Sequence, residues 1–207
     1  MRALGIGRWA SLTGVASVAA FVASALAVGF YEYLPAAVEI ESFLESNSSR
    51  VAVGGYLGLY GSLLLLVWVS LGLRTSMGGA EGGDRRITVV AYAGGVTAVM
   101  IAMVAYAALI AAAARAGDDG GITETGAAAL YDLASTLQGV AFPFVLALLI
   151  GAYGAAALRT GVAPRWLAWT SLILALGSLT PLSYAVLGLD MLWVAYVSLR
   201  LSSAGGR

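Results

Sequence analysis

One aspartate in the last apolar stretch has the residue type and position that most directly suggest chemistry. Asp190 is the single charged residue between Trp166 and Leu199. If Arg200 marks the inner boundary of a membrane, Asp190 lies about 15 Å deeper along a helix, near the middle of the bilayer. A carboxyl at that depth would be protonated or paired, and a proton-coupled role would follow. The sequence favours a simpler interpretation, in which the final helix begins near Asp190 and the carboxylate caps it at the outer surface.

Two further carboxylates could act together with Asp190. Glu32 and Asp132 each close an apolar run on the side of the chain predicted to be outside. The three residues could ring an outward-facing vestibule that binds a cation or a basic ligand. The favoured alternative is that these helices simply end where a charge becomes tolerable.

Residue types that are missing exclude most other chemistry. The sequence has no cysteine, histidine or lysine. Thiolate nucleophiles, imidazole bases, Schiff-base lysines and the usual ligands of zinc, copper and haem are therefore excluded. We expect no metal site and no cofactor, and the zero net charge leaves no footprint for nucleic acid. No paired carboxylates or Ser/His set appear, so the chain is not expected to be an enzyme, and a lipid-modifying membrane enzyme is disfavoured.

The elements that position these residues are predicted to be membrane-spanning helices. Of the 207 residues, 60% are hydrophobic and 11% charged, and the mean hydropathy is +0.90. An average soluble domain has roughly 45–50% apolar and 25% charged residues. We therefore predict an all-α, polytopic integral membrane helix bundle that forms one transmembrane domain over residues 1–207. The six predicted spans are 9–31, 51–73, 87–114, 133–158, 164–180 and 183–201.

The first apolar run has an alternative interpretation. Arg2 and Arg8 precede it, and Ala25 and Ala27 lie near its end, so it could be a secretory signal with a cleavage site. We favour a membrane span, because the apolar region of a signal is usually only about 7–15 residues long.

The segments between spans are predicted from their polar residues and glycines. A short helix opening at Pro35 would carry Ile40, Phe43 and Leu44 on one side and lie on the membrane surface or cap the bundle. The glycine-rich segment 74–86 is interpreted as a flexible connector. Inside the fourth span, Pro143 should kink the helix, and neighbouring helices should satisfy the carbonyl that it frees.

Small residues in the second span predict a close helix contact. Gly54, Gly58 and Gly61 follow one another at helical spacing, and a Gly-x-x-x-Gly pair lets two helix backbones approach. We favour a packing role over a functional one. If the protein acts by assembly with itself or with a membrane partner, this face should be exposed.

The distribution of arginine predicts the orientation. Six spans place nine of the 11 arginines on one side and leave Arg50 and Arg115 on the other. Arginine accumulates on the cytoplasmic side of membrane proteins, so both termini are predicted to be cytoplasmic. Five spans would put Arg200 and Arg207 on the outer side, so the distribution of arginine favours an even number of spans. Arginine without lysine, together with abundant alanine and glycine, indicates a GC-rich bacterial genome and hence the bacterial inner membrane.

The second half of the chain resembles a known family. The matching residues run from Leu130-Tyr131-Asp132-Leu133 to Phe142-Pro143-Phe144, and then over Arg159-Thr160-Gly161-Val162-Ala163-Pro164-Arg165-Trp166-Leu167. This pattern resembles the DUF4386-type, largely actinobacterial, multi-spanning proteins of unknown function. The resemblance implies a small helical bundle of the inner membrane and carries over no catalytic residue.

The cytoplasmic turn between the fourth and fifth spans has a physical interpretation of its own. Gly161 can cap the end of one helix, and Pro164 can begin the next. Arg159 and Arg165 would hold the turn at the anionic leaflet. The turn is therefore predicted to be architectural.

Two functional hypotheses follow. The first is a non-enzymatic component that acts by binding, sensing or assembly, with the lipid bilayer and a membrane-protein partner or a second copy of the chain as its partners. The alternative is a small transporter or permease that moves a cation or a proton-coupled solute. A transporter should have a polar cavity at mid-membrane depth lined by Asp190 or by tyrosines.

Overall fold

The computed structural model describes residues 3–29, 37–81, 85–118 and 121–204. Every regular element in these ranges is helical, which confirms the predicted all-α helix bundle. The elements are α1 (Ala3–Val28), α2 (Ala37–Val67), the π-helical η1 (Trp68–Leu73), α3 (Arg74–Glu81), α4 (Arg86–Gly117), α5 (Glu124–Thr136), the π-helical η2 (Leu137–Ala141), α6 (Phe142–Thr160), α7 (Arg165–Ser178) and α8 (Ser183–Ala204).

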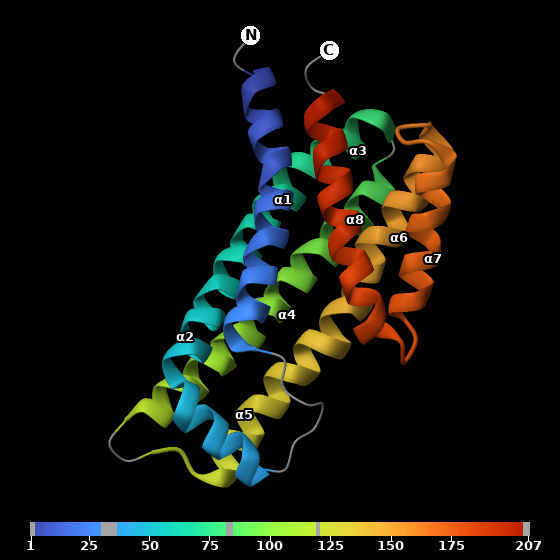
Figure 1. The fold of residues 1–207 in the computed structure, drawn as a ribbon. Coiled ribbons are helices and arrows are strands. Elements are labelled where there is room, and N and C mark those ends of the chain that lie inside the picture. Colours follow the sequence, from blue (N-terminus) through green and yellow to red (C-terminus); the bar gives the residue numbers. More distant parts are fainter. Residues whose placement is uncertain (1–2, 30–36, 82–84, 119–120, 205–207) are drawn as a thin grey trace.

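The helices run up and down between two ends of different charge. The start of α1 and the end of α8 lie at one end of the bundle, together with α3 and the connection from α6 to α7 (Figure 1). We call this the basic end, and the arginines there whose side chains the structure describes are Arg74, Arg85, Arg86, Arg159, Arg165 and Arg200. The opposite, acidic end holds the beginnings of α2 and α5 and the end of α4, with Glu39, Glu41, Glu45, Asp118 and Glu124.

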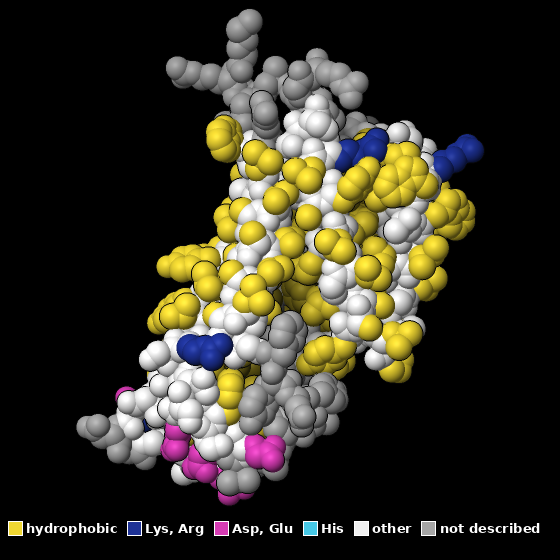
Figure 2. Space-filling view, in the orientation of Figure 1, with side chains coloured by type: hydrophobic (Ala, Val, Ile, Leu, Met, Phe, Trp, Pro, Cys, Tyr) yellow, Lys and Arg dark blue, Asp and Glu magenta, His cyan; other side chains and the backbone are white. Residues whose placement is uncertain are grey.

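Between these ends the outer surface is apolar. Figure 2 shows hydrophobic side chains over the middle of the molecule and acidic side chains gathered at one end. Leu26, Met100 and Leu192 on three different helices are each more than 60% exposed. A soluble monomer rarely exposes a continuous apolar surface of this kind.

Five helical segments are long and apolar enough to cross a membrane. They are Trp9–Val28, Glu39–Glu81, Arg86–Gly117, Glu124–Thr160 and Ser183–Ser203. The predicted span 164–180 corresponds to α7, which has 14 residues and covers about 21 Å. The α7–α8 hairpin is accordingly short, and its turn ends before the acidic end of the bundle (Figure 1).

A π-helical turn replaces a simple kink at Pro143. Proline has no N–H to bond the carbonyl four residues earlier, which here belongs to Gly139. Residues Leu137–Ala141 form the wider turn η2, and the Gly139 carbonyl accepts a hydrogen bond from the Ser183 hydroxyl at 3.0 Å. A neighbouring helix thus satisfies the freed carbonyl, as predicted.

The glycine-rich segment is more ordered than predicted. Residues Arg74–Glu81 form α3, so the prediction of a flexible connector is wrong for this part. Met77 is buried, and the Glu81 carboxylate accepts hydrogen bonds from the backbone N–H and the hydroxyl of Thr88 at 3.0 and 2.7 Å. Buried and capping contacts outweigh the weak helix propensity of glycine.

The polar stretch before the second span caps the acidic end. The helix described from Ala37 bends at Asn47, whose backbone is not helical (φ −128°, ψ 16°). Ile40 and Leu44 are buried in the same apolar cluster as Ala127 of α5, so this segment packs into the bundle. Pro35 lies outside the described residues.

The three predicted packing glycines all make contacts inside the bundle. The Gly54 carbonyl accepts a hydrogen bond from Ser24 of α1 at 2.6 Å, and a Cβ on Gly61 would lie 3.1 Å from the Phe21 ring of α1. A Cβ on Gly58 would overlap the ring of Tyr106 in α4. These glycines are therefore used within the chain and do not form an exposed face.

We predict that Gly58→Val destabilises the protein by about 1–3 kcal/mol, because the added atoms meet a ring that has no room to move. Tyr106 stacks on Phe21 with ring centroids 6.0 Å apart. Thermal unfolding in detergent micelles, followed by circular dichroism, measures the loss. Gly188→Ala is the control, since a Cβ there meets nothing within 4 Å. Equal losses in both variants would contradict this packing.

Candidate functional site

Asp190 lies inside α8 and is fully buried. The interpretation of Asp190 as an N-cap at the outer surface is therefore wrong. The helix begins earlier, at Ser183, because Thr180 and Pro181 supply a start signal: the Leu182 N–H bonds the Thr180 hydroxyl at 3.2 Å. Asp190 follows Ser183 by seven residues, about 10 Å along the helix.

Two serines of α7 meet two polar side chains of α8. The Ser178 hydroxyl donates to Asp190 Oδ2 at 2.8 Å, and the Trp193 indole N–H donates to Ser171 Oγ at 2.8 Å. We call these four residues the α7–α8 polar seam. Ser171 and Ser178 are seven residues apart, and Asp190 and Trp193 are three apart, so each pair shares one helix face.

At Trp193 the polar seam contacts other parts of the bundle. The Trp193 ring makes edge contacts with Tyr153 of α6 at 5.2 Å and with Trp68 of η1 at 6.3 Å between centroids. Farther along α8, Ser198 lies against Gly14 of α1, where a Cβ would overlap the Ser198 hydroxyl. A movement of the polar seam would therefore change the packing of several helices.

The carboxyl of Asp190 is incompletely bonded. Its Oδ1 atom is buried without a hydrogen-bond partner, and so is Nε1 of Trp68. A buried polar atom without a partner costs about 1–3 kcal/mol, so its presence calls for an explanation. Glu81 Oε1 and Gln138 Nε2 are likewise buried without a partner among the described residues. The free Asp190 oxygen can take up a proton or accept a hydrogen bond from a water molecule or a small polar group.

The outer carboxylates are not brought to Asp190. Asp132 is exposed on α5, seven residues before Gly139, and Asp190 is seven residues after Ser183. Because Ser183 and Gly139 touch, and the two helices lead away from that contact toward opposite ends, Asp132 and Asp190 are separated by about 20 Å along the bundle. Glu32 lies outside the described residues.

The predicted turn between α6 and α7 has the expected architecture. Gly161 caps α6 in the left-handed conformation (φ +71°), and its N–H bonds the Ala157 carbonyl at 3.0 Å. Pro164 stands at the N-cap of α7, one residue earlier than predicted, and Arg165 begins the helix. Arg159 and Arg165 are exposed at the basic end.

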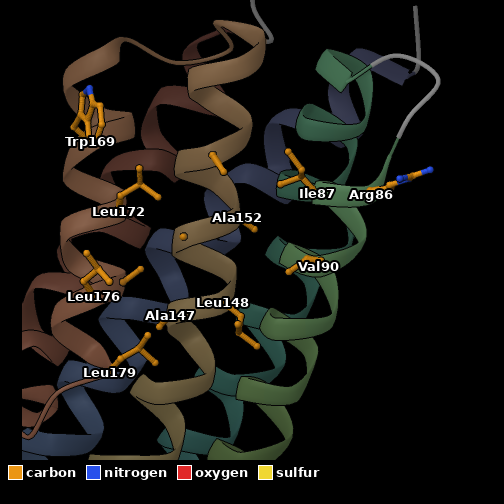
Figure 3. A pocket seen from close by; sticks show the side chains of 13 residues that line it. Arg86, Ile87, Val90, Ala147, Leu148, Ala152, Trp169, Leu172, Leu176 and Leu179 are labelled. Carbon is orange, nitrogen blue, oxygen red and sulfur yellow. The ribbon is translucent and has the colours of Figure 1, made fainter.

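A groove on the surface is apolar. It has a volume of about 640 Å³ and lies between α4, α6 and α7, lined by aliphatic residues with Trp169 and Arg86 toward one end (Figure 3). Neither Asp190 nor a tyrosine lines it. This groove is therefore not the polar cavity that the transporter hypothesis requires.

The polar seam offers the chemistry of a single carboxyl. Within the ranges that the structure describes, no group of three or more acidic, histidine or cysteine residues could hold a metal ion. What this arrangement can do is exchange a proton and change its hydrogen bonds. Sequence reasoning found Asp190 but missed Ser171, Ser178 and Trp193, although the seven-residue serine spacing could have indicated them.

No family model, curated protein or solved structure matches the chain. The resemblance to DUF4386-type proteins stays a prediction.

We predict that Ser178→Ala destabilises the protein by about 1–3 kcal/mol, because Asp190 then loses its hydrogen-bond donor. The double variant Ser178→Ala, Asp190→Leu should recover most of this loss, since both polar partners are replaced by apolar groups. Thermal unfolding in detergent provides the comparison. Ser42→Ala, at an exposed position of α2, serves as control. If the double variant is less stable than Ser178→Ala alone, the account of the carboxyl is wrong.

Proposed function

We propose that the chain is a multi-pass protein of the bacterial inner membrane, with six passes and both termini in the cytoplasm. Five apolar segments of sufficient length support this proposal, as does the apolar outer surface between two charged ends. α7, the fifth pass in chain order, brings the number of passes to six, and the α7–α8 hairpin is short enough to require a locally thin bilayer.

The charge difference between the two ends supports the orientation. Six arginines whose side chains the structure describes lie at the basic end, whereas Arg50 and Arg115 are near the acidic end. The positive-inside rule assigns the basic end to the cytoplasm. The start of α1 and the end of α8 lie at this end, as an even number of passes requires.

Single cysteines can test this topology directly, because the chain has none of its own. We expect a membrane-impermeant thiol reagent to label Ser49→Cys and Thr125→Cys in intact cells. Gly79→Cys and Ser203→Cys should be labelled only after the membrane is permeabilised. All four positions are exposed in the structure. Labelling of Ser203→Cys and Ser49→Cys from the same side would contradict six passes.

We further propose that the protein is a non-enzymatic sensor in which Asp190 binds and releases a proton. The single observation that carries this proposal is a fully buried carboxyl with one oxygen bonded to Ser178 and the other unpartnered. An ionisable group at membrane depth is costly and is by default a functional candidate. The buried positions of Gly54 and Gly58 favour sensing over assembly through that face.

The two forms of the carboxyl favour different arrangements of the hairpin. A neutral Asp190 can remain between α7 and α8, whereas a carboxylate there needs water or a countercharge. Ionisation should therefore loosen the polar seam and hydrate it. Water and protons would reach Asp190 most directly from the α7–α8 turn, which lies about 10 Å away along α8, on the side away from the basic end. The sensor would accordingly respond to the pH outside the cytoplasm.

Trp193 provides a reporter one helical turn from Asp190. We expect its fluorescence to shift to the red as pH rises, because water enters the ionised seam, and we expect Asp190→Asn to abolish this shift. The exposed Asp132→Asn is the matched control and should respond like the native chain. The variant Trp193→Phe should lose the pH-dependent shift, which would assign the shift to Trp193 among the tryptophans of the chain. A native chain with no shift from acidic to alkaline pH, or an Asp190→Asn variant with the full shift, would overturn the proposal.

A further inference from the structure

The burial of side chains along α8 changes at Asp190. In the described stretch from Ser183 to Leu189, Ser183 is the single buried residue, and a Cβ on Gly188 would meet nothing within 4 Å. Beyond Asp190 the inner face of the helix is buried, with Trp193, Val194, Val197 and Ser198. Asp190 therefore lies where an open half of α8, toward the α7–α8 turn, meets a closed half, toward the basic end (Figure 1).

Three aromatic rings fill the closed half. The Trp193 ring meets Tyr153 of α6 and Trp68 of η1 edge to face, with interplanar angles of 85° and 88°. We call these three residues the ring cluster. All three side chains are buried, in the same apolar core as Leu149 of α6 and Leu167 of α7. Close packing of this kind leaves no continuous space for water.

The ring cluster lies between Asp190 and the basic end. Trp193 is about one helical turn from Asp190 in that direction, and the ring contact places Trp68 at the same depth. Tyr153 is close enough to Arg200 for an electrostatic interaction between its hydroxyl and the guanidinium. The three rings therefore occupy the interval from Asp190 to Arg200, about 15 Å along α8.

The hydroxyl groups in this interval are bonded within their own helices. Ser198 donates to the Val194 carbonyl at 2.6 Å, and Ser171 donates to the Leu167 carbonyl at 2.7 Å. Neither serine therefore donates a hydrogen bond toward Asp190. Because a proton moves through a membrane protein along a relay of ionisable groups, hydroxyls or water, the closed half is poorly suited to carry one.

Asp190 is surrounded by groups that keep their charge near neutral pH. The elements packed against α8 are α1, η1, η2, α6 and α7. Apart from Asp190, the described ionisable side chains of these elements and of α8 itself are tyrosines and arginines: Tyr153, Arg159, Arg165, Tyr184, Tyr196 and Arg200. Tyrosine and arginine side chains ordinarily change their charge only above about pH 9. A response of this region below that pH therefore reports Asp190.

We propose that the ring cluster closes the cytoplasmic side of Asp190, so that protons reach this carboxyl from the outer side alone and none cross the protein. The proposal rests on the membrane orientation and the proton site proposed above. It gives Trp68, Tyr153 and Trp193 the role of a barrier. This barrier separates a sensor from a transporter, which has to open its binding site to both sides of the membrane in turn.

Phospholipid vesicles can measure from which side Asp190 is reached. The purified full chain with Ser49→Cys is reconstituted in mixed orientation, and an impermeant thiol reagent counts the molecules whose acidic end faces outward. We expect a rapid rise of the external pH to change the Trp193 fluorescence by that same fraction of its full amplitude. Nigericin, which then equalises the pH across the bilayer, should produce the remainder. A full change before nigericin is added would overturn the proposal.

Variants of Tyr153 test the barrier itself. Tyr153→Ala removes one ring of the cluster, and water can enter the space because the Arg200 guanidinium lies beside it. The full fluorescence change should then come at once. An electrical potential across the vesicle should also drive proton uptake several-fold above that of the native chain. Tyr153→Phe keeps the ring and should behave like the native chain. Tyr153→Ala combined with Asp190→Asn should lose the added proton uptake.

A second variant and an exposed control complete the series. Trp68→Leu thins the ring cluster from η1 and should also admit protons. Tyr60→Ala removes an exposed ring from α2, outside the cluster, and should leave proton uptake at the native level. Circular dichroism in detergent shows whether each variant is folded. If Tyr153→Ala and Trp68→Leu are folded and admit no more protons than Tyr60→Ala, the rings are not the barrier.

The barrier and the proton sensor can fail separately. A native chain whose Trp193 fluorescence responds to pH in detergent, and responds in vesicles to either side, keeps the sensor and loses the barrier. A native chain without any fluorescence response loses the sensor. Proton uptake then decides about the barrier, because this measurement needs no tryptophan signal: uptake by Tyr153→Ala that depends on Asp190 supports the barrier, and native-level uptake contradicts it.

Discussion

The hydrogen bond from Ser183 to the Gly139 carbonyl sets the depth at which the last helix begins. Pro143 frees that carbonyl, and η2 turns it toward α8. Tyr184 reinforces the contact: its hydroxyl donates to the Ser135 carbonyl at 3.0 Å, and its ring lies where a Cβ on residue 139 would be. The position of Asp190 follows, because a rigid helix carries it about 10 Å from this anchor into the interior.

The rest of the bundle is assembled by small residues and hydroxyl groups. Helices that are apolar on both their inner and outer faces gain little from hydrophobic association in lipid, so close packing and hydrogen bonds have to hold them. On α1, Ser17 and Ser24 donate to the carbonyls of Gly61 and Gly54 at 2.7 and 2.6 Å. Glycine at both acceptor positions lets the α1 and α2 backbones approach closely enough for these bonds.

The parts of this architecture that could be predicted are those set by local patterns. Long uncharged runs indicated the helices, and the αL cap at Gly161 and the bend around Pro143 followed from the properties of single residues. The α3 helix was missed, because its order depends on burial of Met77 and on Glu81 bonding a residue of another helix. Propensity alone gives no information about such contacts.

In the candidate site, Asp190 could be identified from the sequence, but its helix register and its hydrogen-bond partner could not. The type of Asp190 and its distance from Arg200 indicated a membrane depth, but two helix registers were compatible with the same sequence. The choice between them depended on Thr180 and Pro181, which start α8 early and bury the carboxyl. The hydrogen-bond partner of Asp190 is Ser178 on α7. Which face of α7 points toward α8 depends on the helices that pack on both sides of α7, and the sequence of α7 alone does not give this.

α7 is the element that the polar seam and the groove share. Ser171 and Ser178 on one face contact α8, while Leu172 and Leu179, each one residue farther along, line the groove. Successive residues in a helix point about 100° apart, so a small rotation of α7 alters both surfaces together. With 14 residues it is short for a membrane helix. A rotation of α7 that loosens the polar seam when Asp190 ionises would therefore also change the shape of the groove on the other side of this helix.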